Sequence, residues 1–558
     1  MPPSQATSKI DYFDLGRYSR HITAVNADAE LWFNRGLIWT YGFNRAEAVT
    51  CFSNAISADP RCAMAYWGLA HSSGAYYNKS WSLFDPKDLR QSLQRSSDAA
   101  QKAFDLREGC SPLEKALIEA VQRRYAAASA DEDLSKRDKV YADAMQRVYD
   151  EHGEDLDVAA LCAEALMNLT PWNLWDPYTG EPTPQSRTCT VGRYLETAFE
   201  SEAAWRHPGL LHLYIHYIEM SREPERGVKK ADCLRRLVPD GGHLNHMPSH
   251  LDVLVGNYQE AIAANQAAVV ADDKYLDKIG SKNIYTFYRA HNYQSLIYAA
   301  MLCGRSKVAL ESVAKLENSL PEELLRIELP PMADWLEAFL AVRPHVLIRF
   351  GLWEEILRLQ LPHDERLYCV TTTTIHYAQG VAHAAIGNVD GALKSQDCFK
   401  NALELVPSTR YDYPNKCVDI LKVGEAMLAG EIEYRRGNYT KSFRNLEESI
   451  RLDDNLIYSE PWGWMQPTRH AYAALLLEQG RVEDAATAYA ADLGLDSSLP
   501  RGHQHPNNIW ALHGYHECLT RLGRHDEAKV IEPPLTLAKA VADVSIASSC
   551  YCRRTSPE

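Results

Sequence analysis

The chain is 558 residues long, and hydrophobic and charged residues make up 46% and 24% of it. No segment reaches the roughly 18 consecutive apolar residues that a membrane-spanning helix needs, so the sequence predicts no membrane association. The formal net charge of −15 is spread along the chain and would repel a phosphate backbone, so nucleic acid is not an expected partner.

Residues 1–28 precede the first helical pattern and form a predicted N-terminal extension. Residues 1–20 hold neither the apolar core of a secretion signal nor an arginine-rich mitochondrial presequence. The sequence therefore predicts a cytoplasmic protein.

The first strong pattern is a helix-turn-helix unit between Ala29 and Pro60. In a 34-residue unit that starts at Ala29, positions 4, 8, 11, 20, 24, 27 and 32 hold Trp32, Gly36, Trp39, Ala48, Phe52, Ala55 and Pro60. This pattern resembles the tetratricopeptide repeat, whose small residues at positions 8 and 20 let its two helices approach closely. The resemblance implies an all-α chain built from such helix pairs.

Weaker copies of the unit follow, each marked by a glycine in the turn and a small residue five positions later. They are Gly256 with Ala261, Gly304 with Ala309, Gly437 with Ser442, Gly480 with Ala485, and Gly523 with Ala528. We expect an all-α, tetratricopeptide-like right-handed superhelix (an α-solenoid) with loop insertions and either a concave groove or a closed central cavity. A single repeat domain is predicted for residues 29–540, with a tail at 541–558.

Two H-x-x-x-H pairs, His212 with His216 and His246 with His250, lie within residues 205–295. Residues four apart share one face of a helix, so both members of a pair can reach one metal ion. The second pair follows the first by 34 residues, which puts both at positions 5 and 9 of consecutive first helices. These positions face the groove, and adjacent helix axes lie about 8–10 Å apart. The sequence therefore predicts four histidines around one transition-metal ion.

Other residues are predicted to complete this site. Glu219, His243 and His291 are candidates for moving protons, and His291 is alternatively a ligand. Glu219 is alternatively a ligand or, through its H-x-x-E spacing from His216, a carboxylate that orients a ligand. Three aromatic residues are candidates for a pocket that binds a small organic substrate, although packing between repeats also explains each of them: Tyr214, Tyr288 and Trp172.

The segment HPGLLHLYIHYIE, followed by GHLNHMPSH, resembles a subgroup of tetratricopeptide-repeat proteins from fungi and bacteria that carry these motifs in consecutive repeats. The resemblance extends upstream through AEALMNLTPWNLWD, which carries Glu164, and downstream to YRAHNYQSL, which carries His291. It implies a shared site but no particular reaction.

Imidazole ligands suit iron, copper and zinc, whereas calcium and magnesium prefer oxygen ligands. We therefore expect a metal-dependent enzyme that acts on a small organic substrate. An iron- or copper-dependent oxidoreductase is the first hypothesis, with zinc as the other candidate ion. The alternatives are a metal-dependent hydrolase or lyase at the same site, and a non-enzymatic scaffold that binds a partner protein in an open groove.

Overall fold

The computed structural model describes residues 12–283 and 285–554. These residues form two compact units. The first unit runs to Leu251 and includes Ala267–Ile279, and the second consists of Asp252–Gln266 and the described residues from Gly280 onward. The division into an extension, one repeat domain and a tail stays a prediction.

The predicted all-α class is confirmed. In the part of the chain that the structure describes, the only β-strands are β1 (Tyr411–Asp412) and β2 (Asn415–Lys416), which form a short antiparallel hairpin. None of the described helices is both long enough and apolar enough to cross a membrane.

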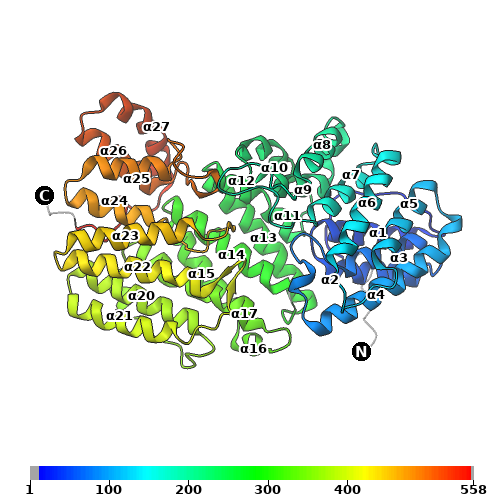
Figure 1. Cartoon of the computed structure of the whole chain (residues 1–558), viewed down its shortest axis with the longest axis horizontal. Helices are drawn as coiled ribbons and strands as arrows, with labels where there is room; N and C mark the ends of the chain where they lie inside the picture. Colours follow the sequence, from blue (N-terminus) through cyan, green and yellow to red (C-terminus); the bar gives the residue numbers. More distant parts are fainter. Residues whose placement is uncertain (1–11, 284, 555–558) are drawn as a thin grey trace. The chain divides into compact units, whose positions relative to one another are not determined.

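The first unit is a succession of helices in which each packs against the next from α1 to α8 (Figure 1). Its helices are α1 (Ala27–Tyr41), α2 (Arg45–Ala58), α3 (Ala63–Ser73), α4 (Pro86–Leu106), α5 (Pro112–Tyr125), α6 (Ser135–His152), α7 (Leu156–Met167), α8 (Thr188–Ala198), α9 (Pro208–Ile218), α10 (Val228–Leu234), α11 (Gly242–His246) and α12 (Pro248–Leu254), with 3₁₀ turns η1 (Trp81–Leu83), η2 (Arg107–Gly109), η3 (Glu202–Arg206) and η4 (Pro224–Gly227). The residues of α12 after Leu251 belong to the second unit. Helix α9 also packs against α1 and α7, so the first repeat and the histidine-bearing helix are neighbours.

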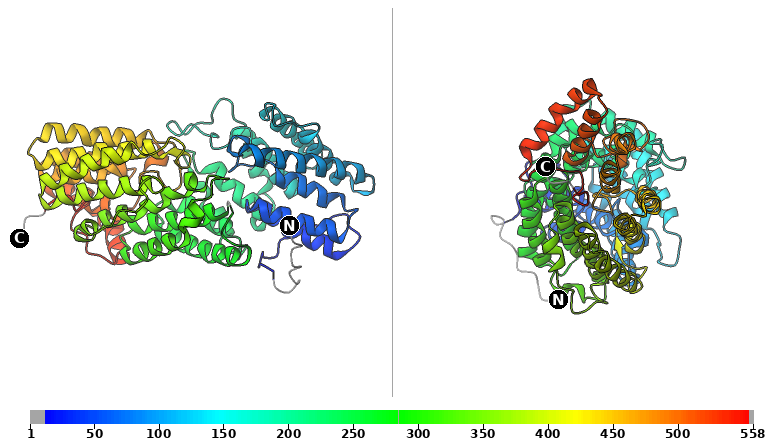
Figure 2. Two further views of the ribbon diagram at one scale, coloured as in Figure 1. Left: turned by 90° about the horizontal axis from the view of Figure 1, so that it is seen from below. Right: turned by 90° about the vertical axis from the view of Figure 1, so that its left-hand side faces the viewer.

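The second unit repeats a pairing of consecutive helices, seen as stacked rods in its yellow part in Figure 2. Its elements are α13 (Tyr258–Ile279), which is shared with the first unit from Ala267 on, α14 (Tyr285–Leu302), α15 (Ser306–Ser319), α16 (Glu322–Leu325), α17 (Met332–Leu336), η5 (Glu337–Ala341), α18 (Val342–Arg349), α19 (Trp353–Leu357), α20 (Cys369–Ile386), α21 (Val389–Leu403), β1, β2, α22 (Cys417–Arg435), α23 (Tyr439–Asp454), α24 (Thr468–Glu478), α25 (Val482–Asp492), η6 (Arg501–His503), α26 (Ile509–Arg521) and α27 (His525–Val541). The first helices of successive pairs also contact one another, α20 with α22 and α24 with α26. Paired helices that contact the next pair are the arrangement that the repeat pattern predicts.

The turn glycines do what the sequence predicts. Gly256, Gly304, Gly437, Gly480 and Gly523 each lie between the two helices of a pair, with φ between 71° and 79°. This left-handed conformation costs little only for glycine, because glycine has no Cβ atom.

Gly36, the small residue at position 8 of the first repeat, leaves space for a neighbouring aromatic ring. A Cβ atom added at Gly36 would lie 2.8 Å from the Phe52 ring, and one added at Gly68 would lie 2.3 Å from the same ring. Phe52 is fully buried, so its ring fills the space that two glycines on α1 and α3 leave open. The close approach of α1, α2 and α3 therefore depends on these glycines.

We expect Gly36→Ala to destabilise the first unit by about 1–3 kcal/mol, because the added methyl group overpacks a filled core around a rigid ring. Urea denaturation followed by circular dichroism measures the change. Gly109→Ala is the matched control, since no atom lies within 4 Å of the Cβ that it would add. An equal effect of the two substitutions would contradict the packing role of Gly36.

Candidate metal centre

Helix α9 carries two of the predicted metal ligands. Pro208 lies in its first turn, where a missing N–H costs nothing, and His207 caps the helix by accepting a hydrogen bond from Leu210 N to Nδ1 at 3.1 Å. His212 and His216 follow one turn apart and are 0% and 1% exposed. The start of the helix thus fixes both imidazoles in the interior.

The hydrogen bonds of these two histidines determine which ring nitrogen carries the proton. His212 Nδ1 lies 2.6 Å from the carbonyl oxygen of Tyr41, and His216 Nδ1 lies 2.8 Å from Glu219 Oε1. Both oxygens only accept, so each Nδ1 is the donor. Each Nε2 therefore bears a lone pair, and both Nε2 atoms are buried without a hydrogen-bond partner among the described residues. Two unpartnered lone pairs in a protein interior are suited to a metal ion.

Glu219 connects the two H-x-x-x-H motifs. Its Oε1 accepts from His216 Nδ1, and its Oε2 accepts from His250 Nδ1 at 2.5 Å. Burial alone would raise the pKa of Glu219, but its electrostatic interactions with His250 and His216 and their N–H hydrogen bonds outweigh burial and lower this pKa to about 2. Glu219 is thus an ionised, fully buried carboxylate whose two oxygens orient two imidazoles.

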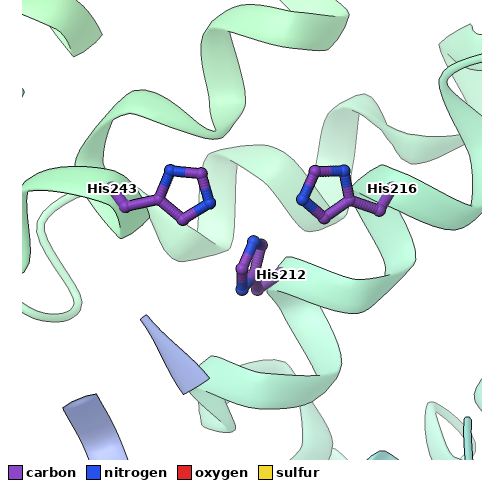
Figure 3. Close-up of side chains that lie close together, drawn as sticks. All are labelled: His212, His216 and His243. Atoms are coloured by element: carbon purple, nitrogen blue, oxygen red, sulfur yellow. The ribbon is translucent and has the colours of Figure 1, made fainter. Parts of the chain in front are cut away.

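His243, on α11, completes a histidine triad with His212 and His216, shown in Figure 3 with one ring nitrogen of each turned toward a shared space. One nitrogen from each ring lies within 4.8 Å of the others. An ion at the centre would lie within about 2.8 Å of each nitrogen, compared with 2.0–2.1 Å for zinc–imidazole bonds. Ring movements of less than about 1 Å would therefore close the site. The other two predicted ligands, His246 and His250, lie beside this triad, with ring centres 5.9 Å from His243 and 5.6 Å from His216.

The triad is held in the neutral form that binds metals. Burial lowers the pKa of His212 and His243 well below the ordinary value, and neighbouring histidines lower both further. Burial also lowers the pKa of His216, although Glu219 opposes this shift. All three imidazoles are therefore available as ligands near neutral pH.

The second H-x-x-x-H motif, His246 with His250, does not lie on one continuous helix. Pro248 lacks a backbone N–H, and the chain is divided there into α11, which ends at His246, and α12, which begins at Pro248. His246 Nε2 and His250 Nε2 still face each other at 2.8 Å, and Ser249 Oγ lies 3.4 Å from His246 Nδ1. Among the described residues, His212 and His216 form a group with His243, and His216 and His250 form a second group with Glu219, so the four-histidine site stays a prediction.

An aromatic wall surrounds the triad. The Phe43 ring centre lies 4.4 Å from that of His212, and the Phe43 ring stacks on His216 and His243 at 5.9 and 5.5 Å. Tyr77 lies 4.9 Å from His216, and Trp172 lies edge-on at 5.7 Å. Trp172 is therefore next to the site, as the substrate-binding hypothesis requires.

Two of these aromatic residues have unusual backbone conformations. Phe43 and Trp172 have φ values of 56° and 59°, in the left-handed region that bulky residues rarely adopt. Such strain costs about 1–3 kcal/mol per residue and is concentrated at functional sites. Sequence reasoning missed Phe43, Tyr77 and the Tyr41 carbonyl, because nothing in their local sequence marks them as neighbours of residues more than 130 positions away.

Three other predicted residues, Tyr214, Tyr288 and His291, have aromatic or hydrogen-bond neighbours within their own units. Tyr214 is on the opposite face of α9, where its hydroxyl donates to Glu196 at 2.5 Å and its ring contacts Phe199 at 5.5 Å. His291 and Tyr288 are on α14 in the second unit, where His291 stacks on Phe287 at 6.3 Å and Tyr288 packs on Tyr285 at 5.4 Å. These contacts fit the packing interpretation of the two tyrosines.

Glu164, which the motif resemblance includes, has an internal partner. It lies on α7, is 3% exposed, and forms an ion pair with Arg45 and a longer contact of 3.5 Å with His71. Burial would raise its pKa, but Arg45 and His71 lower it to about 2. Glu164 is thus an ionised carboxylate held by Arg45 rather than by the histidine triad.

Replacing Glu219 by glutamine tests its orienting role. The amide offers one acceptor oxygen where the carboxylate offers two, so either His216 or His250 loses its Nδ1 partner. We expect metal affinity to fall by about 10–100-fold, measured by competition with a chelator. Glu223→Gln, which changes a 61% exposed carboxylate of the same unit, should leave the affinity unchanged. Equal affinities for the two variants would contradict the role of Glu219.

Three solved structures are similar to this chain at low scores. A chain of the APC/C hetero-tetramer Cut9-Hcn1 is 13% identical, with 88% of this chain and 76% of that chain covered and a TM-score of 0.30. Yeast Tom70 is 13% identical, with 92% and 99% covered and a TM-score of 0.26. Naa15/Naa10 bound to HypK-THB is 12% identical, with 91% and 70% covered and a TM-score of 0.20. No protein-family model and no curated protein matches the chain.

Proposed function

We propose that the first unit binds one transition-metal ion through His212, His216 and His243, and that the protein is a metal-dependent enzyme that acts on a small organic substrate. The observation that carries this proposal is the pair of buried Nε2 lone pairs on His212 and His216, which have no hydrogen-bond partner among the described residues. The opposite nitrogen of each ring is held as a donor, so both rings are fixed in the tautomer that a metal requires.

Three protein ligands support a catalytic ion over a structural one. A structural zinc site is closed by four ligands, whereas a catalytic ion keeps a position for water or substrate. An ion with three neutral ligands can polarise a bound substrate or activate bound oxygen or water. The Phe43 ring beside all three imidazoles would keep bulk water away from such an ion.

The ligand chemistry favours copper. Non-haem iron oxygenases use two histidines and one carboxylate, but both oxygens of Glu219 are engaged by imidazole N–H groups. Copper accepts imidazole ligands alone, so a copper-dependent oxidoreductase is our first assignment. Zinc bound by three histidines would instead activate water for hydrolysis. A zinc-dependent hydrolase is therefore the second candidate, because the same three imidazoles can bind zinc.

A hydrogen-bonded chain leads away from the ligands. It runs from His216 through Glu219 to His250 and on to His246. By accepting from Nδ1 of His216, Glu219 would raise the basicity of the Nε2 atom that faces the ion.

The test is metal analysis of protein purified without a histidine tag. We expect about one equivalent of copper, iron or zinc per chain, or its restoration when metal is added to stripped protein. Azide added to copper-loaded protein should change the visible spectrum if a coordination position is open. Protein that neither retains nor takes up a metal would refute the proposal, and an azide-insensitive spectrum would indicate a closed structural site.

A further inference from the structure

The second unit contains a cavity lined by elements that are far apart in its sequence. Its volume is about 30 Å³, and on this measure a single water needs about 10–15 Å³. The cavity therefore accepts a short chain of a few heavy atoms. Most of its wall is apolar, but five polar side chains reach it: Gln294, His345, Thr374, Asp412 and Trp464.

Two of these side chains are buried with a polar atom that has no hydrogen-bond partner among the described residues. His345, on α18, is 5% exposed and its Nδ1 is unpartnered. Trp464, in the loop before α24, is 2% exposed and its Nε1–H is unpartnered. Each such group costs free energy unless water or a ligand satisfies it. Since both residues line the cavity, a ligand there would reduce this cost.

Asp412 gives the cavity a negative charge. Its Oδ2 accepts from Gln294 Nε2 at 2.9 Å, and in the described part of the chain it forms no ion pair. The nearest arginine along the chain, Arg410, pairs instead with Asp334 at 3.0 Å and Glu337 at 3.7 Å. Burial raises the pKa of Asp412 to about 6, against the hydrogen bond from Gln294. The carboxylate is thus held in an apolar wall without a counterion.

Two other assignments of the cavity fit less well. Cys417, His345 and Asp412 all line it, but burial raises the pKa of the Cys417 thiol well above its usual value and Asp412 raises it further. A nucleophilic cysteine requires the thiolate, so this thiol is inert. Nor do these side chains form one of the metal-binding groups found among the described residues.

We propose that this cavity binds a small primary ammonium compound that also carries a hydroxyl oxygen. The ammonium group would pair with Asp412, and the aromatic face of Trp464 in the wall adds a favourable surface for a cation. The hydroxyl oxygen would accept the hydrogen bond from Trp464 Nε1. Because every residue of the site belongs to the second unit, the proposal does not depend on the metal centre.

Ligand-observed NMR titration of the full chain tests the proposal. The probes are ethanolamine, methylammonium, the neutral isostere ethylene glycol and the anion glycolate. We expect ethanolamine to bind most tightly, methylammonium more weakly, and the two probes without a positive charge at least about tenfold more weakly than ethanolamine, since a hydrogen bond to a charged group contributes about that factor or more.

Two variants assign the contacts. Asp412→Asn keeps the shape and the hydrogen bond from Gln294, and it should weaken both ammonium probes at least about tenfold. Asp419→Asn is the control, because it removes the same charge from an exposed position on α22. Trp464→Phe keeps an aromatic face but removes the N–H, so it should weaken ethanolamine binding more than methylammonium binding. Circular dichroism verifies that each variant is folded.

The outcomes that overturn the proposal are distinct. Equal binding of ethylene glycol and ethanolamine would mean that the cavity does not select a cation. Unchanged ammonium binding in folded Asp412→Asn would place the cation elsewhere. Absence of binding by either ammonium probe to the unchanged chain would assign the cavity to ordered water alone.

Discussion

Replacing His243 by alanine should remove the metal ion, whereas replacing His246 by alanine should leave it bound. His243 converges with His212 and His216 on one space, while His246 directs its Nε2 toward His250. Removing one of three ligands leaves two-coordinate metal, so we expect affinity to fall by more than the roughly 10–100-fold that loss of an orienting residue costs. Metal content after chelator competition measures the difference between the two variants.

The same pair of variants separates the triad from the quartet that sequence spacing predicts. If His212, His216, His246 and His250 held the ion, His246→Ala would release it and His243→Ala would retain it. His21→Ala serves as the control for general loss of a histidine, because the His21 side chain is 88% exposed. Retention of the ion in His243→Ala would therefore contradict the triad.

Replacing Asp492 by alanine should destabilise the second unit by about 3–5 kcal/mol, the range for breaking a buried charged pair. Asp492 is 1% exposed and accepts hydrogen bonds from His470 Nε2 and His505 Nδ1, both at 2.8 Å, and from Asn508 Nδ2 at 2.9 Å. The substitution leaves the His470 and His505 donors without an acceptor and removes one of the two acceptors of the Asn508 amide. Urea denaturation at pH 7 measures the loss, and Asp484→Ala, at a 52% exposed position on the same helix, should change stability little.

The effect of Asp492 also has a defined pH dependence. Burial would raise its pKa, but His470 and His505 outweigh burial and hold the pKa far below its ordinary value. Its stabilising effect is therefore complete above the unfolded-state pKa of about 4 and decreases as the pH falls below that value. The stability difference between the unchanged chain and Asp492→Ala should shrink below pH 4. A difference that stays constant down to pH 2 would contradict an ionised Asp492.

The helical pairs could be predicted because the residues that determine them lie close together in the sequence. Gly36 and the turn glycines determine a close approach and a left-handed turn within a few residues of their own position, so a 34-residue pattern is sufficient to place them. The division into two units could not be predicted in this way, since it depends on which helices pack together and not on the pattern within a pair.

The site was only partly predictable for the same reason. The spacing of His212 and His216 on α9 places both imidazoles on one face, and the H-x-x-E spacing points to the contact between His216 and Glu219. That His243 is the third neighbour depends on how α11 packs beside α9, which a periodic pattern does not specify. The second contact of Glu219, with His250, spans 31 residues and crosses between helices. Such contacts arise only from tertiary packing.

The turn between α1 and α2 has a practical consequence for experiments on this protein. Together with Tyr41, the last residue of α1, whose carbonyl sets the tautomer of His212, it supplies the Phe43 ring that covers all three imidazoles. A shortened chain that begins after Pro60 would retain His212, His216, His243, His246 and His250 yet lose this cover. Truncations intended to isolate the histidine motifs should therefore keep the first helical pair, because the amino-terminal repeat is a structural part of the centre.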